Sequence, residues 1–158
     1  MILKFNLKKF LISILIPLAV GGLSAFITRN DMDIYKDINR PPLSPPSVLF
    51  PVAWTILYIL LGISFYIVWN TDYKESKAKP YFFFIAGLIL NFIWSPVFFS
   101  ARLYFVALII LLLLLITIVL MFAEFHKVSE LAAYLQIPYL LWLLFAGYLN
   151  IGIYLLNR

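Results

Sequence analysis

Long apolar stretches separated by short polar segments form the main pattern along this chain. Residues 106–123, for example, include no charged side chain, and a run of that length can cross the roughly 30 Å hydrocarbon core of a bilayer as a helix. Lipid offers backbone groups no hydrogen-bond partner, and these runs lack the alternation that barrel strands need, so we expect helices. The pattern predicts five transmembrane helices, at about residues 10–28, 47–70, 80–100, 104–124 and 131–157.

The first apolar run also resembles a signal peptide, because Lys4, Lys8 and Lys9 precede it. No convincing small-x-small cleavage site follows, and Pro17 with the pair Gly21-Gly22 suits a kinked, closely packed helix. We therefore expect this segment to remain as a transmembrane helix. The fold class is then all-α, a membrane-embedded bundle of five transmembrane helices in which residues 1–158 form a single domain.

The stretch 29–46 departs from the apolar pattern. It carries several charged residues and ends in the run Arg40-Pro-Pro-Leu-Ser-Pro-Pro46, whose four prolines prevent helix and favour extended polyproline geometry. A connection of this length is usually a functional lid or a disordered linker. Because prolines stiffen the chain, we expect a long Pro-rich lid loop between helices 1 and 2, over one mouth of the bundle.

The composition agrees with a membrane location. The chain is 65% hydrophobic and 12% charged, with a mean hydropathy of +1.02, which is more apolar surface than a soluble domain of 158 residues could bury. There is no cysteine, so disulfides and thiol catalysis are excluded. With His126 as the single histidine, we expect neither a metal site nor a cofactor.

A net charge of +5 could suggest nucleic acid as a partner, but the basic residues lie at segment ends, where membrane orientation and headgroup contacts explain them. We therefore expect the lipid bilayer, and no nucleic acid, as the partner of these charges. Seven Lys and Arg residues fall on the side of the N-terminus (4, 8, 9, 74, 77, 79 and 127) and five on the other (29, 36, 40, 102 and 158). This difference predicts a cytoplasmic N-terminus.

Three of the predicted helices carry aromatic and polar residues on a single face, because these residues recur at spacings of three and four. The faces are formed by Trp54, Tyr58 and Gly62, by Asn91, Trp94 and Ser95, and by Trp142, Ala146, Leu149 and Asn150. For any one of these faces, helix packing is a sufficient explanation, since small and polar residues commonly mediate contacts between transmembrane helices. Three such faces, each with a deep tryptophan, indicate a shared pocket.

Asn91 and Asn150 strengthen this interpretation. An amide within an apolar run is costly unless it faces a partner or a cavity. An aromatic pocket with a few hydrogen-bonding groups is typical of a small-molecule site. Ion transport fits poorly, because no Asp, Glu, Lys or Arg lies near the middle of a predicted helix. His126 lies at a helix end, which argues against nucleophilic hydrolysis.

Three blocks resemble the translocator protein (TspO/MBR) family, also called the tryptophan-rich sensory proteins or peripheral-type benzodiazepine receptors. They are the run that starts at Arg40 and includes Pro51-Val-Ala-Trp54 and Tyr58, the run that starts Asn91-Phe-Ile-Trp-Ser-Pro96, and the run that starts Pro138-Tyr-Leu-Leu-Trp142 and ends at Asn150. Their order and spacing match over almost the whole chain. The resemblance implies a five-helix bundle, often dimeric, in a multi-pass protein of a bacterial cell membrane.

Members of this family bind porphyrins, sterols and synthetic benzodiazepine-type ligands, and some bacterial members are reported to break down protoporphyrin in light. Carried over by position, the resemblance implies that the ligand-binding residues are Tyr35, Trp54, Asn91, Trp94, Trp142, Ala146 and Leu149. Tyr58 and Asn150 join this set through the helix faces described above. Trp54 and Trp142 would be the catalytic pair if porphyrin degradation takes place.

The chain also departs from the family pattern. Leu43, Val48 and Val106 stand where many members carry tryptophan, and Ile151 replaces the tyrosine of the animal sterol motif, which makes sterol the weaker ligand. The small-residue spacing that some members use for dimer contact on helix three is altered, because Asn91 follows Gly87 by four residues. A homodimer therefore stays an open alternative.

The leading hypothesis is a membrane receptor or sensor that binds a protoporphyrin-type tetrapyrrole or another flat hydrophobic molecule in the aromatic pocket. The first alternative is an enzyme that degrades the bound porphyrin in light. The second is a transporter of tetrapyrroles or sterols, although five helices cannot form two equal inverted repeats.

Overall fold

The computed structural model describes residues 4–158, and these residues form helices and connecting loops without a strand. The elements are α1 (Leu7–Thr28), α2 (Ile34–Asp37), α3 (Leu49–Asn70), α4 (Ala78–Ser95), the π-helical turn η1 (Pro96–Ser100), α5 (Tyr104–Val128), α6 (Glu130–Tyr134) and α7 (Ile137–Leu156). Within the described residues, five helical segments are long and apolar enough to cross a membrane. The predicted all-α bundle of five transmembrane helices is confirmed.

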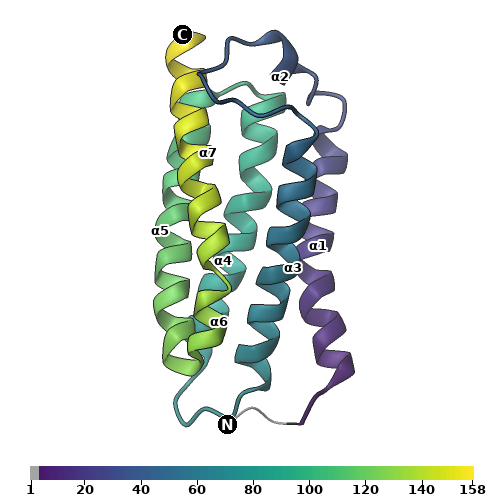
Figure 1. Ribbon diagram of the computed structural model, residues 1–158, viewed down its shortest axis with the longest axis vertical. Helices are drawn as coiled ribbons and strands as arrows, with labels where there is room; N and C mark the ends of the chain where they lie inside the picture. The colour runs from purple at the N-terminus through teal and green to yellow at the C-terminus, as the bar shows by residue number, and fades with distance from the viewer. Residues whose placement is uncertain (1–3) are drawn as a thin grey trace.

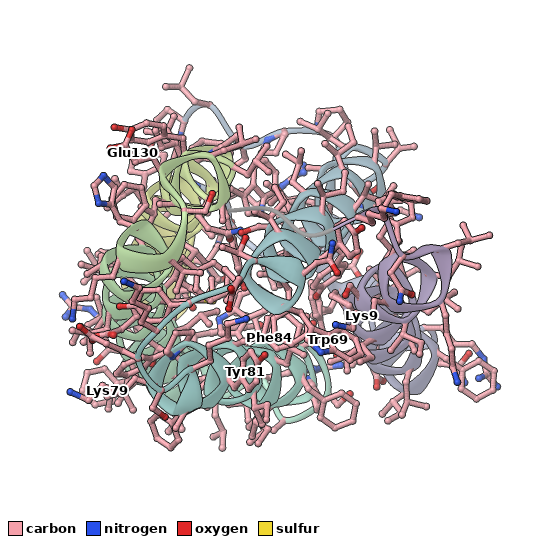
Figure 2. The ribbon with its side chains drawn as sticks, turned by 90° about the horizontal axis from the view of Figure 1, so that it is seen from below. Lys9, Trp69, Lys79, Tyr81, Phe84 and Glu130 are labelled. Atoms are coloured by element: carbon pink, nitrogen blue, oxygen red, sulfur yellow. The ribbon has the colours of Figure 1, made fainter. Side chains whose placement is uncertain are left out.

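The five long helices run alternately up and down, so that α1 begins at the bottom of Figure 1 and α7 ends at the top. α1 packs against α3 and α4, and α5 packs against α4 and α7. The loop that contains α2 lies across the top of the bundle (Figure 1). The opposite end carries basic residues: in Figure 2, Lys79 lies at the rim of this end, whereas Lys9 lies beside Trp69.

Two glycines allow α1 and α3 to approach closely. A Cβ atom built on Gly62 would lie 2.6 Å from the Cα atom of Ile14 and 2.7 Å from the carbonyl oxygen of Ser13. A Cβ atom on Gly21 would lie 2.1 Å from the ring of Tyr58. Small residues at such crossings let helix backbones meet in a membrane, where dispersion contacts and interhelical hydrogen bonds drive packing. The backbone of α1 occupies the space beside Gly62, where any other residue would place a side chain.

The helix bounds differ from the sequence prediction in informative places. The fifth predicted helix, 131–157, is divided into α6 and α7, and the break precedes Pro138, whose missing N–H is tolerated in the first turn of α7. The third predicted helix ends in η1, which begins at Pro96. The fourth continues to Val128, four residues beyond the predicted end. Pro17 does not end α1, because neighbouring helices in a membrane protein can satisfy the freed backbone groups.

The loop between α1 and α3 is more ordered than a Pro-rich run suggests. It contains the single helical turn α2, which lies before the prolines and was not expected. Its backbone bonds to α7, since Asn39 N–H donates to Oδ1 of Asn157 at 3.0 Å and Asn157 Nδ2 donates to the Asn39 carbonyl at 2.8 Å. The Tyr148 hydroxyl donates to the Pro42 carbonyl at 2.6 Å. Leu43 has a φ of 65°, a positive value that residues other than glycine rarely adopt.

Candidate functional site

Two adjoining cavities lie beneath the loop, at the upper end of the bundle in Figure 1. One has a volume of about 140 Å³ and lies between α1, α3 and α4. The other has about 20 Å³ and lies between the loop, η1 and α7. Phe50, Trp94 and Phe99 line both cavities and therefore form the wall between them. We call the two together the aromatic site.

Both intramembrane asparagines of the site are fully engaged. The Tyr58 hydroxyl donates to Oδ1 of Asn91 at 2.9 Å, and Nδ2 of Asn91 donates to the Tyr139 hydroxyl at 2.7 Å. Asn91 thus ties α3, α4 and α7 together. Asn150 accepts from the indole N–H of Trp94 at 3.2 Å and donates to the Tyr104 carbonyl at 2.9 Å. The expectation that each amide needs a partner within the bundle is confirmed for both residues.

Aromatic rings join α3 to α7 at this level. Trp54 stacks on Tyr58 with ring centroids 5.5 Å apart and meets the ring of Trp142 edge to face at 6.3 Å. Tyr139 also contacts Trp54 edge to face, at 6.0 Å. Such geometries suit the quadrupoles of aromatic rings. At this level, α3 and α7 meet through these aromatic side chains.

The indole N–H of Trp142 has no hydrogen-bond partner among residues 4–158, although its nitrogen is buried. A buried donor without an acceptor costs roughly 1–3 kcal/mol, and groups of this kind are rare in native structures. The indole N–H of Trp94, by contrast, donates to Oδ1 of Asn150. Trp142 therefore keeps a buried donor that no residue of the described chain accepts.

The loop closes the aromatic site from above. Tyr35 is buried, and its hydroxyl donates to the Pro45 carbonyl at 3.0 Å while its ring meets Phe50 edge to face at 5.1 Å. The guanidinium of Arg40 lies over the Tyr35 ring, 4.9 Å from its centroid. The side chain of Ser100 donates to Asp31, which fastens the start of the loop to η1. A positive charge consequently lies at the roof of the site.

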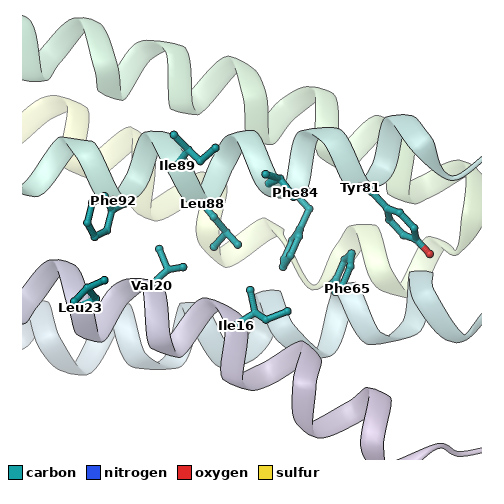
Figure 3. Close-up of a pocket in the computed structure, with 10 residues that line it drawn as sticks. Ile16, Val20, Leu23, Phe65, Tyr81, Phe84, Leu88, Ile89 and Phe92 are labelled. Atoms are coloured by element: carbon teal, nitrogen blue, oxygen red, sulfur yellow. The ribbon is translucent and has the colours of Figure 1, made fainter.

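The residues that the sequence singled out come together in one cluster. Trp54, Tyr58, Asn91 and Trp94 line the first cavity, and Tyr35, Trp94, Ala146, Leu149 and Asn150 line the second. Trp142 lines neither cavity but contacts Trp54 and Phe50 through its ring. A separate apolar cavity, drawn in Figure 3, contains none of these residues.

Sequence reasoning missed several members of the site. Phe50 precedes Trp54 by four residues and Tyr139 precedes Trp142 by three, so helical spacing alone could have found both. The contribution of α1 was also missed, although its lining residues recur at helical spacing. They are Gly21, Ser24, Ala25 and Thr28.

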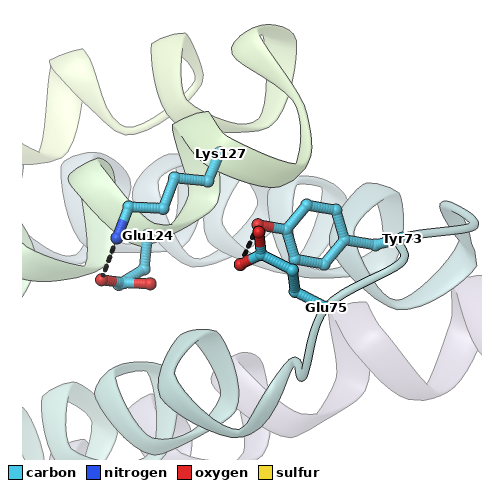
Figure 4. A network of polar contacts seen from close by, with 4 residues as sticks. All are labelled: Tyr73, Glu75, Glu124 and Lys127. Carbon is cyan, nitrogen blue, oxygen red and sulfur yellow. Dashed lines mark hydrogen bonds and ion pairs between the residues drawn. The ribbon is translucent and has the colours of Figure 1, made fainter.

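No Asp, Glu, His, Lys or Arg side chain of the described residues lines the two cavities of the aromatic site. At the opposite end of the bundle, Lys127 pairs with Glu124 at 2.7 Å and the Tyr73 hydroxyl bonds Glu75 at 3.3 Å (Figure 4). Among the described residues, no group of three or more His, Cys, Asp or Glu side chains could hold a metal ion. On the loop, the hydrogen bond to Asp33 raises the pKa of Lys36 above its ordinary value. The aromatic site therefore offers stacking and hydrogen bonding, without an acid or base at its centre.

Comparison with known proteins agrees with this architecture. Residues 13–156 match the TspO/MBR family. The chain is 40% identical over 154 residues to the tryptophan-rich protein TspO of Archaeoglobus fulgidus, covering 96% of this chain and 99% of that protein. It is 33% identical over 139 residues to the translocator protein of Bos taurus, covering 86% and 82%.

A third relative is the tryptophan-rich sensory protein of Cereibacter sphaeroides, which is 31% identical over 123 residues and covers 78% of this chain and 76% of that protein. These matches extend over nearly all of the five spans, including the three blocks whose resemblance the sequence indicated. The chain is a multi-pass membrane protein that belongs to the TspO/MBR family.

Proposed function

We propose that this protein is a membrane receptor or sensor that binds a porphyrin-type tetrapyrrole in the aromatic site. The observation that carries the proposal is the unpartnered indole N–H of Trp142, buried within a cluster of aromatic rings beneath the loop. A flat, electron-rich macrocycle would stack on these rings, and an acceptor on its edge would complete the hydrogen bond. The name of the sensory protein among the relatives fits this role.

The chemistry of a porphyrin suits the groups present. Its macrocycle can stack on Trp54 and Trp142, each contact contributing roughly 0.5–1.5 kcal/mol beyond area burial. Its carboxylates carry negative charge, and Arg40 above Tyr35 supplies a positive charge at the roof of the site. A guanidinium can bind a carboxylate through two parallel hydrogen bonds. The macrocycle thus matches the aromatic rings within the site, and the carboxylates match the positive charge of Arg40 above it.

The site must open before it can take such a ligand. Sites for molecules of this size usually have volumes of about 300–1,000 Å³, whereas the first cavity has about 140 Å³. In this proposal, the arrangement with the small cavity is the closed form of the site. Opening requires the loop to lift from α7, with loss of the Asn39–Asn157 contacts, and the rings of Trp54 and Trp142 to separate.

The test is a titration of the detergent-purified protein with protoporphyrin in the dark, followed by the Soret absorption band of the porphyrin. Trp54→Phe/Trp142→Phe should weaken binding about tenfold or more, a loss of about 1.4 kcal/mol. Trp69→Phe serves as the matched control, since Trp69 lies at the other end of the bundle. Equal affinity of the double variant and the wild type would rule out this site.

Light-driven oxidation of the bound porphyrin is a second candidate function, favoured by the contact between the Trp54 and Trp142 rings at 6.3 Å. In this reaction the illuminated porphyrin is oxidised and dioxygen is reduced, so no general acid or base is needed. Illumination of the complex in air should bleach the Soret band faster than free porphyrin, and the double variant should lose the difference. Equal bleaching with and without protein would exclude this activity and leave the binding proposal intact.

A further inference from the structure

An apolar groove runs along the outer face of the bundle between α1 and α4, with a volume of about 450 Å³. It shares no lining residue with the aromatic site. Figure 3 shows Val20 and Leu23 of α1 facing Leu88 and Phe92 of α4 across the groove, with Phe65 of α3 toward one end. Its lining surface offers no polar atom, so only a hydrocarbon or an aromatic group fits there.

The groove opens toward the bilayer. Leu23, Ile85 and Ile89 on its rims are each 54% exposed. From Tyr81 to Phe92, its α4 wall extends about 16 Å at the helical rise of 1.5 Å per residue. This length is close to half of the roughly 30 Å hydrocarbon core. The groove thus has the depth of one leaflet, measured from the end of the bundle that carries Lys9.

Two lysines lie at this end of the groove. The Lys9 ammonium lies over the ring of Trp69, 5.4 Å from its centroid, and Trp69 contacts Phe65 at 6.0 Å. Phe65 in turn contacts Tyr81, the first lining residue on α4, at 5.5 Å. Lys77 donates to the carbonyl oxygens of Trp69 and Thr71. A chain of aromatic contacts therefore connects the apolar groove to Lys9, and Lys77 joins it at the backbone of Trp69.

Among residues 4–158, neither Lys9 nor Lys77 forms a salt bridge. Burial lowers the pKa of Lys77, and repulsion from Lys9 lowers it further, whereas Asp72 opposes this shift to a lesser extent. Both ammonium groups also contact the same residue, since Lys9 lies over the ring of Trp69 and Lys77 donates to the Trp69 carbonyl oxygen. An anion placed between them would be favoured by both. Aromatic rings and lysines at the membrane interface are also the groups that contact lipid headgroups.

We propose that the groove between α1 and α4 binds one anionic phospholipid, with an acyl chain lying along Phe84–Phe92 and its phosphate between Lys9 and Lys77. The apolar walls exclude a free phosphate ion as the natural occupant, and the lysine pair selects against neutral lipid. The bound lipid would hold α1 against α4 and leave the aromatic site free. This proposal does not depend on porphyrin binding.

The test uses the full chain purified in detergent with equal amounts of phosphatidylglycerol and phosphatidylcholine that carry identical acyl chains. Native mass spectrometry then counts the lipids that stay bound. The wild type should retain a single phosphatidylglycerol with at least a fivefold preference. Lys9→Gln/Lys77→Gln should reduce this preference below twofold. Lys74→Gln/Lys79→Gln, which removes two exposed lysines at the same end, should keep it.

A second variant tests the groove itself. Ile85→Trp/Ile89→Trp fills it while both lysines remain, and it should reduce retention of either lipid at least fivefold, with an unchanged helical circular dichroism spectrum. Retention of phosphatidylglycerol by the Lys9→Gln/Lys77→Gln variant at the wild-type level would overturn the proposal. A lipid-free dimer that Ile85→Trp/Ile89→Trp converts to monomer would also overturn it, because a second copy would then occupy the groove.

Discussion

Asn91 is the residue on which the interior polar contacts of the bundle converge. It accepts from Tyr58 and donates to Tyr139, and all three side chains are buried. Because the bilayer core provides no water, each hydroxyl depends on this one amide for its partner. A single residue of α4 thereby sets the distance of α3 and α7 from each other at the level of the aromatic site.

We expect Asn91→Leu to destabilise the protein by about 1–3 kcal/mol, because it leaves two buried hydroxyls without a partner. Thermal unfolding in detergent, followed by circular dichroism, measures the effect. The triple variant Asn91→Leu/Tyr58→Phe/Tyr139→Phe should recover more than half of the loss, since removal of all the polar groups together is nearly neutral. A triple variant less stable than Asn91→Leu alone would show that packing volume, and not hydrogen bonding, matters here.

At the scale of the elements, α1 and α3 form a close crossing that leaves almost no space for further atoms. The crossing positions Tyr58 against Gly21, so the packing of these two helices also places one wall of the aromatic site. The loop forms its roof and is held to the end of α7 by paired amide contacts. The aromatic site thus depends on the close packing of α1 against α3 and on the loop that covers it.

Gly62→Ala should destabilise the fold by about 1–3 kcal/mol, the range typical of overpacking, because the added methyl would meet the backbone of Ile14 at 2.6 Å. Gly22→Ala is the matched control on the facing helix, since a Cβ there meets nothing within 4 Å. We expect the control to change stability by less than about 0.5 kcal/mol. Both values come from the same detergent unfolding measurement, and equal effects would contradict the close crossing.

Asn157→Ala removes the two hydrogen bonds that the Asn157 side chain makes with Asn39, and it should loosen the loop. We expect porphyrin to associate and dissociate at least threefold faster, with a smaller change in affinity, in stopped-flow measurements of the Soret band. Asn157→Asp keeps the acceptor for the Asn39 N–H and loses the donor, so its rates should lie between those of the other two proteins. Unchanged rates in both variants would show that the loop does not control access.

For the whole molecule, the odd number of spans places the two termini on opposite sides of the membrane. The excess of Lys and Arg at the end opposite the loop predicts that this end faces the cytoplasm. The aromatic site would then open toward the other side, and the proposed anionic lipid would lie in the cytoplasmic leaflet, where negative lipids are found. The orientation of the protein in the membrane therefore determines the side from which a ligand reaches the aromatic site and the leaflet that supplies the lipid.

The absence of cysteine makes this orientation directly measurable. In intact bacterial cells, a membrane-impermeant maleimide should label Ser47→Cys, which is exposed beside the loop, and leave Ser76→Cys unlabelled at the other end. Inverted vesicles should give the opposite result. The wild type serves as the blank, and labelling of Ser76→Cys alone in intact cells would contradict the predicted orientation.

The sequence by itself determined the number of spans and grouped part of the residues that meet in the aromatic site. Apolar runs as long as the bilayer is thick can only be helices, and a spacing of three or four places residues on one face whatever surrounds the helix. These local rules grouped Trp54, Asn91 and Trp142 as candidate residues of one pocket. They could not show α2, the division between α6 and α7, or the part of α1 that lines the site, because these depend on contacts between distant segments.

Only the tertiary structure decided how these faces meet. It closed the cavity to about 140 Å³, gave Asn91 two tyrosine partners and left Trp142 with a buried donor that no described residue accepts. It also created the groove between α1 and α4, beside which Lys9 and Lys77 lie. The physical reason is that cavity volume and hydrogen-bond satisfaction are properties of packed side chains from several helices, whereas sequence periodicity describes one helix at a time.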